Sequence, residues 1–256
     1  MIRRFAAPLR SSKASDLLTF KKIQYWCYNF DGLFEGEIMG RVGTIHNSDW
    51  RDSFLFVGNH PALDFVNTRP VQNGEPLELL SDFGTLLRWF QAAKLLSSQE
   101  AGSLRQQWGE SAQARNVVHA MRQLRERLRK AFLAWERGGA VHHTVIDELN
   151  RLMAEHPMRT RLEASGSAME LWFEPRRPED LFAPLAHSAA TLFANVDRNR
   201  VRKCGQCVLH FYDTSKKGTR RWCSMQLCGN RLKVAAYAAR QRLRPHKRPD
   251  HPTISL

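Results

Sequence analysis

The sequence has no run of about 18 or more apolar residues, so it predicts no membrane-spanning helix. Its start, MIRRFAAPLRSSK, is basic but lacks the apolar stretch and the small-residue cleavage site of a secretory signal. Cysteine is scarce, and the clustering of four of the five cysteines argues against a disulfide scaffold. These absences favour a protein of the reducing cytoplasm with no membrane partner.

The sequence also lacks the short motifs of common enzyme classes. It contains no Walker A loop, no Gly-x-Ser-x-Gly, no His-Glu-x-x-His and no dinucleotide-binding glycine fingerprint. The sequence therefore predicts a protein that is not an enzyme, although missing motifs alone do not exclude a ligand-activated one.

Acidic residues are nearly missing between Arg198 and Arg248. This stretch holds 15 lysines and arginines against one acid, Asp213, while the formal net charge of the whole chain is +14. One fifth of the chain therefore carries essentially all the excess charge, which indicates a separately built electrostatic surface. A solvated tail is the alternative, but such tails are rarely interleaved with Trp, Phe, Tyr and Cys as this stretch is.

The pattern divides the chain into four segments. Residues 1–50 show no clean period, so we expect either a poorly ordered arm or a mis-assigned start, with the true start at Met39. Residues 54–196 are expected to form a mostly helical domain with one small hairpin. A separate module is expected over 198–244, and a tail over 245–256.

Helical signals recur through the second segment. A turn is expected at Gly58-Asn59, followed by a helical turn after Pro61. Ser81 is the expected N-cap of the next helix, and Ser97 with Glu100 forms an expected capping box. The predicted helices cover 81–96, a segment opening at Ser97, about 111–137, about 144–155 and 179–196, and a hairpin is predicted over 159–175.

The clustered cysteines have the spacing Cys204-x2-Cys207, fifteen residues, then Cys223-x4-Cys228. Four thiolates complete a tetrahedral shell around one zinc ion, and a closed shell of this kind is structural rather than catalytic. A redox Cys-x-x-Cys is the rival, but the following residues are β-prone and a second pair is available. His210 is a weaker candidate ligand, because four cysteines already fill the shell.

Between the two pairs we expect a short β-hairpin, with LHFYDT as one strand, a turn at Lys217-Gly218 and RRW as the returning edge. A helix is expected over about 229–243, with one apolar face towards the zinc site and a basic face opposite. Basic groups on such a scaffold suit phosphate contact. The residues assigned to nucleic-acid binding are Lys216, Lys217, Arg220, Arg221, Asn230, Arg231, Lys233, Arg240, Arg242 and Arg244.

The stretch FYDTSKKGTRRWCSMQLCGNR strongly resembles the CGNR zinc-finger domain, named for the tetrapeptide that here begins at Cys228. Upstream, GNHPALDFVNT over 58–68 is similar to the opening of the ABATE domain, the usual N-terminal partner of that finger. The resemblance implies a bacterial transcriptional regulator in which the finger binds DNA and the N-terminal domain senses a ligand. It also implies one structural Zn²⁺ on the four clustered cysteines.

The expected fold class is α+β: a mostly helical N-terminal domain with a small β-hairpin, and a C-terminal four-cysteine finger of the treble-clef or ribbon type. Within the ABATE-like part, polar positions that could line a ligand pocket are Asn59, Asp64, Asn67 and Thr68. Helix capping and turn hydrogen bonding are the favoured alternative for these side chains.

Two other functions stay open. RNA binding is favoured if Phe211, Tyr212 and Trp222 are exposed for stacking on bases. A zinc-stabilised adaptor would instead use its basic face for an acidic protein partner. A homodimer is a further alternative, and neither the effector nor the DNA target can be read from the sequence.

Overall fold

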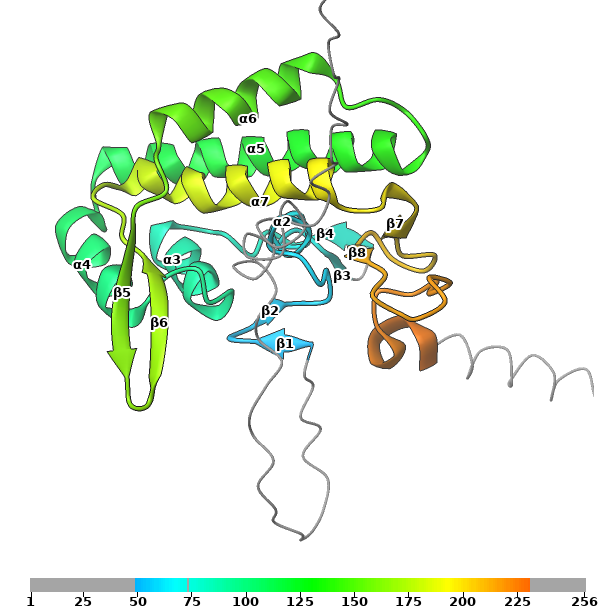
Figure 1. The fold of residues 1–256 in the computed structure, drawn as a ribbon, viewed down its shortest axis with the longest axis horizontal. Coiled ribbons are helices and arrows are strands. Elements are labelled where there is room, and N and C mark those ends of the chain that lie inside the picture. Colours follow the sequence, from blue (N-terminus) through cyan, green and yellow to red (C-terminus); the bar gives the residue numbers. More distant parts are fainter. Residues whose placement is uncertain (1–48, 73, 231–256) are drawn as a thin grey trace, which may run out of the picture. The chain divides into compact units, whose positions relative to one another are not determined.

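The computed structural model describes residues 49–72 and 74–230 (Figure 1). The predicted arm over 1–50 lies almost entirely outside the described residues, as do the tail over 245–256 and nearly all of the helix predicted over 229–243. No helix in the described ranges is long and apolar enough to cross a membrane.

The second segment is mainly helical, as expected from its periodicity. Its α-helices are α2 (Pro61–Val66), α3 (Phe83–Ala92), α4 (Ser98–Trp108), α5 (Ala112–Glu136), α6 (His143–Glu155) and α7 (Phe182–Asn195), with a short 3₁₀ helix, η1 (Pro178–Leu181), before α7. Three two-stranded antiparallel sheets accompany them: β1 (Trp50–Arg51) with β2 (Phe54–Leu55), β3 (Val71–Gln72) with β4 (Glu75–Pro76), and β5 (Thr160–Ser165) with β6 (Ala168–Phe173).

The start signals of two helices differ from the prediction in detail. Asp82, and not Ser81, is the N-cap of α3, because its carboxylate accepts the Thr85 N–H at 2.7 Å. Ser97 caps α4 as predicted by accepting the Glu100 N–H, but the capping box is incomplete. The Glu100 carboxylate accepts from Arg161 instead, at 2.8 Å, and so ties α4 to β5.

The long helix α5 provides the central packing surface. Its buried residues recur at helical spacing, Ser111 caps it, and Gly138 follows it at a φ of +94°. Helices α5, α6 and α7 lie alongside one another, with α2 against α5 and α7 (Figure 1). The largest fully buried side chains include Trp89, Arg125, Phe65, Phe90 and Phe132.

The described part of the C-terminal segment consists of one strand pair and two short helical turns. It has the antiparallel pair β7 (Val201–Lys203) and β8 (His210–Tyr212), preceded by a 3₁₀ turn, η2 (Arg198–Arg200), and followed by a π-helical turn, η3 (Met225–Gly229). A strand is present within the predicted LHFYDT segment, but the hairpin predicted between the two cysteine pairs was wrong. Tyr212 pairs with Val201, before the first cysteine, rather than with the RRW edge over 220–222. The mixed helical and hairpin architecture confirms the expected fold class.

Candidate metal centre and nucleic-acid interface

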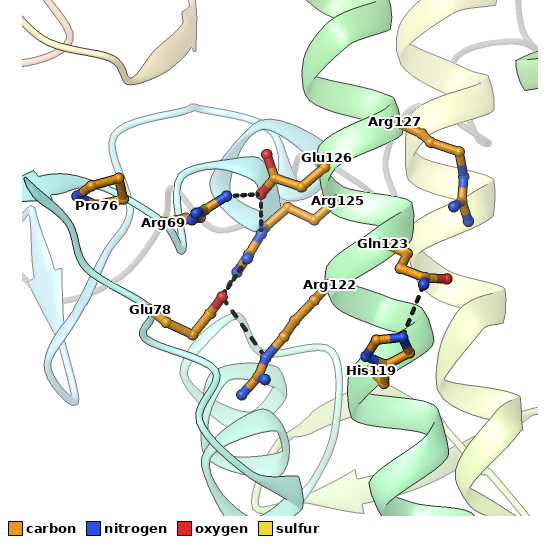
Figure 2. Close-up of a pocket in the computed structure, with 9 residues that line it drawn as sticks. All are labelled: Arg69, Pro76, Glu78, His119, Arg122, Gln123, Arg125, Glu126 and Arg127. Carbon is orange, nitrogen blue, oxygen red and sulfur yellow. Dashed lines mark hydrogen bonds and ion pairs between the residues drawn. The ribbon is translucent and has the colours of Figure 1, made fainter.

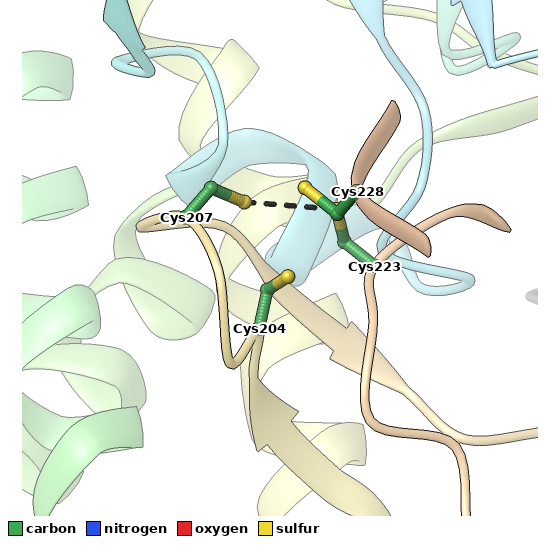
Figure 3. A group of neighbouring side chains, drawn as sticks. All are labelled: Cys204, Cys207, Cys223 and Cys228. Carbon is green, nitrogen blue, oxygen red and sulfur yellow. Dashed lines mark hydrogen bonds between the residues drawn. The ribbon is translucent and has the colours of Figure 1, made fainter. Parts of the chain in front are cut away.

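Three elements bring the four cysteines together (Figure 3). Cys204 directly follows β7, and its N–H donates to the Leu209 carbonyl at 2.8 Å, which closes a tight turn that also carries Cys207. Cys223 ends the loop that follows β8, and Cys228 belongs to η3. The four sulfur atoms all lie within 4.8 Å of one another.

The sulfur positions fit one zinc ion. The Sγ atoms of Cys207 and Cys223 are 3.6 Å apart, and those of Cys223 and Cys228 are 3.7 Å apart. A tetrahedron with Zn–S bonds of about 2.3 Å has edges of about 3.8 Å, so these separations match its edges. Cys204, Cys223 and Cys228 are buried, and Cys207 is partly buried. Four cysteines this close together are able to hold a single structural Zn²⁺, which agrees with the predicted cofactor, and their assignment as its ligands stays a prediction.

The thiols share their protons unequally when no metal replaces them. Hydrogen bonds from the thiols of Cys207 and Cys223 lower the pKa of Cys204. The same contact with Cys204 is the largest cause that raises the pKa of Cys207 and of Cys223, so one thiolate is held by its protonated neighbours. Zinc binding must displace the remaining protons, and zinc affinity is therefore expected to rise with pH.

The hydrophobic core of the finger is completed by residues from outside it. Leu55 and Val57, from β2 and the segment after it, are buried in one cluster with Leu209, Phe211 and three of the cysteines. Ser224 Oγ also donates to the Asp49 carboxylate. No local sequence pattern predicts this shared core, because 49–57 and 204–228 are far apart in the chain.

Polar side chains of the ABATE-like motif hold the backbone of β8. The Asn67 side chain donates from Nδ2 to the His210 carbonyl and accepts the His210 N–H at Oδ1, both at 2.8 Å. Two residues further along β8, the Tyr212 N–H donates to the Gly58 carbonyl at 2.8 Å, and Asn59 Nδ2 donates to the Tyr212 carbonyl at 2.9 Å. We call these four hydrogen bonds the β8 clasp.

Gly58 is fixed from both sides. Its N–H donates to Asp64 Oδ1 at 2.7 Å, and burial raises the pKa of that carboxyl to about 7. A Cβ at position 58 would lie 2.8 Å from Asp64 backbone nitrogen and from Leu63 Cβ, which is closer than such atoms approach. The close approach therefore requires glycine at this position.

The four positions predicted for a ligand pocket lie at or beside this clasp. Asn59 and Asn67 belong to it, Asp64 holds Gly58, and Thr68 donates to the Phe65 carbonyl at 2.7 Å. These are the capping and turn contacts that were weighed as the alternative. A ligand pocket at these four residues stays a prediction.

Asp213, the one acid of the basic stretch over 198–230 that the structure describes, is buried. Asp213 is 0% exposed, and its carboxylate accepts the N–H groups of Ser215 at 2.9 Å and Arg220 at 2.8 Å. Burial opposes its ionisation, but these hydrogen bonds and the charge of Arg202 together lower the pKa of Asp213. We call residues 213–220 the basic loop.

Two arginines that the sequence prediction missed also hold the basic loop. Arg200 Nη1 donates to the carbonyls of Asp213 at 3.0 Å and Ser215 at 2.9 Å, and Arg202 Nη2 donates to the Gly218 carbonyl at 2.8 Å. Gly218 adopts a φ of +59°, which closes the turn. A charge count could not separate such bracing arginines from those that face solvent.

The predicted nucleic-acid contacts divide into two groups. Lys216, Lys217, Arg221 and Asn230 are exposed. Arg220 instead donates to the carbonyls of Trp222 and Cys223 and lies over the Phe211 ring, so its guanidinium is engaged within the finger. The remaining predicted contacts, all beyond Asn230, lie outside the described residues: Arg231, Lys233, Arg240, Arg242 and Arg244.

A closed four-cysteine metal centre with a hairpin and a braced basic loop, docked on a helical domain, defines a zinc-finger protein. Residues 200–241 match the CGNR zinc finger, and residues 59–196 match the ABATE family, described as "Putative stress-induced transcription regulator". The ABATE match covers more than half of the chain, and the chain belongs to the ABATE family. Both predicted families are present in the predicted order, and together they point to a regulatory protein. A search of curated proteins gave no match.

Proposed function

We propose that the protein is a zinc-dependent DNA-binding regulator of transcription whose N-terminal domain senses a ligand. The observation that carries this proposal is the basic loop. Asp213, Arg200 and Arg202 hold its backbone through hydrogen bonds, while Lys216 and Lys217 are left facing solvent. Fixed cationic side chains on a metal-held scaffold are suited to the regularly spaced phosphates of a duplex.

The proposed division of work follows from the contacts. Lys216, Lys217 and Arg221 neutralise phosphates, and Asn230 lies at the start of the segment proposed to enter a groove. Arg220 supports the site by holding two carbonyls of the finger. Zinc supplies no reaction: it closes the shell that keeps the basic loop and η3 together.

Replacing Lys216, Lys217 and Arg221 by Gln tests the proposal. Binding of the zinc-loaded chain to a library of duplex DNA should weaken, and the slope of log K against log salt should fall by about 2 to 3, because each phosphate contact contributes about 0.9. Fluorescence anisotropy at several salt concentrations measures both quantities. Arg151→Gln is the matched control, since Arg151 is an exposed arginine of α6. An unchanged slope in the triple variant would refute these contacts.

Single-stranded RNA binding is the second candidate, supported by the half-buried Trp222 ring with Arg221 at 5.4 Å from its centroid. Phe211 is 0% exposed, so it offers no face for stacking. Competition between duplex DNA and single-stranded RNA separates the two: a preference for RNA that is lost in Trp222→Leu would favour the second function. Binding to neither would favour the protein adaptor.

A further inference from the structure

A solvent-open cavity of about 700 Å³ lies between α5 and the chain that joins α2 to α3, and it shares no residue with the zinc centre (Figure 2). Its volume falls within the range of small-molecule sites. Eight of its nine lining residues are polar or charged, and the ninth is Pro76. The eight are Arg69, Glu78, His119, Arg122, Gln123, Arg125, Glu126 and Arg127.

The lining carries more positive than negative charge, with four arginines against two glutamates. The glutamates are used to order the arginines. Arg125 is 1% exposed and pairs through both terminal nitrogens with Glu78, at 2.7 and 2.5 Å. Glu126 contacts Arg125 at 3.1 Å and Arg69 at 3.5 Å. The array is therefore built and held in place, and not a set of loose surface side chains.

Donors remain available on the arginines around this buried pair. Arg122 uses Nε and Nη2 to hold the carbonyls of Leu80 and Ser81, and Arg127 uses Nε and Nη2 to hold Glu148. Within the described part of the chain, Nη1 of each makes no hydrogen bond. Arg69 is 42% exposed, and among the described residues its side chain has only the long ion pair with Glu126. Planar guanidinium groups are the preferred partners of carboxylates and phosphates.

We propose that this cavity binds a small organic anion that carries two or more negative charges, held by Arg69 and Arg122. The excess of guanidinium groups over carboxylates disfavours a cation and favours an anion. The site gives the proposed ligand sensing a place and a chemical class, and it does not depend on the binding of DNA.

The cavity is connected to the finger by two adjacent residues. Arg125 Nη1 donates to Thr68 Oγ1 at 3.0 Å, and the preceding residue, Asn67, holds the backbone of His210 in the β8 clasp. Arg69, the next residue, lines the cavity itself. A bound anion reduces the repulsion among the guanidinium groups around Thr68, so it stabilises this segment and with it the clasp. Occupation of the cavity and attachment of the finger are thereby coupled.

Calorimetric titration of the zinc-loaded full chain with citrate and with adenosine diphosphate tests the site, with glucose as the neutral control. We expect a dissociation constant below about 1 mM for at least one anion and no heat from glucose. Arg69→Gln and Arg122→Gln should each weaken binding at least about tenfold. Arg151→Gln and Lys216→Gln, one on α6 and one on the basic loop, should leave it unchanged. No binding of either anion, or binding lost only in Lys216→Gln, would overturn the site.

Hydrogen exchange of the His210 amide tests the coupling, because this N–H donates to Asn67. Saturating anion should slow its exchange several-fold in the wild type and much less in Thr68→Val, which lacks the hydroxyl that Arg125 contacts. Equal exchange rates with and without anion in the wild type would overturn the coupling. Neither experiment contains nucleic acid, so a failure of the proposed DNA binding and a failure of this site are distinguishable.

Discussion

Single polar side chains decide how the finger is attached, and Asn67 is the clearest case. Its side chain is 0% exposed and satisfies both backbone groups of His210, as a neighbouring strand would. A buried amide in this position serves as a substitute for ladder hydrogen bonds, and its removal leaves two backbone groups without partners.

Asn67→Ala should therefore lower the free energy of unfolding by about 2 to 3 kcal/mol and speed exchange of the His210 amide. Urea denaturation and hydrogen exchange measure the two effects. Asn59→Gly is the control: it removes one exposed hydrogen bond, to Tyr212, at a position whose φ of +54° suits glycine. A loss in Asn67→Ala no larger than in this control would contradict the role of Asn67 in holding the backbone of His210.

His60 predicts a pH dependence. Burial lowers its pKa to about 4 from an unfolded value of 6.5, so the unfolded state binds more protons between these values. Its contribution to stability is full above pH 6.5 and is lost as the pH falls towards 4. Buried Asp64, with its pKa raised to about 7, acts in the opposite direction over pH 4 to 7.

The contributions of His60 and Asp64 can be separated by measuring how the unfolding free energy of each variant changes with pH. Between pH 7 and pH 5, His60→Asn should lose about 2 kcal/mol less of its unfolding free energy than the wild type does. Exposed His187→Gln should follow the wild type. Denaturant midpoints across this range provide the measurement, and parallel curves for wild type and His60→Asn would refute the assignment.

At the scale of elements, the basic loop is ordered by Asp213, the one acid among its basic residues. Asp213→Ala leaves the N–H groups of Ser215 and Arg220 without their acceptor, at a cost of about 2 kcal/mol. Trypsin should then cut after Lys216 and Lys217 several-fold faster. Asp197→Ala, which removes a similar cap in η2, should not change these cuts. Mass spectrometry of timed digests measures the rates, and equal rates would show that the loop is held by other groups.

The sequence was informative where local physics decides. The period of apolar residues predicted a helix over about 111–137, and α5 covers Ala112–Glu136. Adjacent Ser81 and Asp82 are both good caps, and only the observed hydrogen bond to Thr85 selects the second. Strand pairing was harder, since β8 has two flanking candidates and the choice depends on packing around the zinc site.

The candidate site divides in the same way. The cysteine spacing was sufficient to predict which four side chains cluster, because a tetrahedral coordination shell needs four thiolates and little else. The roles of Arg200, Arg202 and Arg220 could not be predicted, because an arginine that holds a carbonyl and one that meets a phosphate are identical in sequence. The clasp joins residues more than 140 positions apart, beyond any local pattern.

At the scale of the whole molecule, zinc should matter beyond the finger. Chelation, or Cys223→Ser, should abolish exchange protection in 201–229 and also in 54–58, since Leu55 and Val57 lose their buried partners. Protection in α5 and α6 should persist, and the far-UV circular dichroism should keep most of its helical signal. Full protection after verified zinc loss, or collapse of the helices together with the finger, would contradict this division.

Because the finger takes Leu55 and Val57 into its own core, it is a poor module for grafting. A chimera that begins at residue 198 would leave Leu209 and Phe211 facing water, with Asn67 absent from the backbone of β8. The transferable unit is discontinuous in sequence: it includes 49–68 as well as the cysteine-bearing segment. Any domain shuffled onto this finger would have to supply an equivalent strand, an asparagine and a glycine in register.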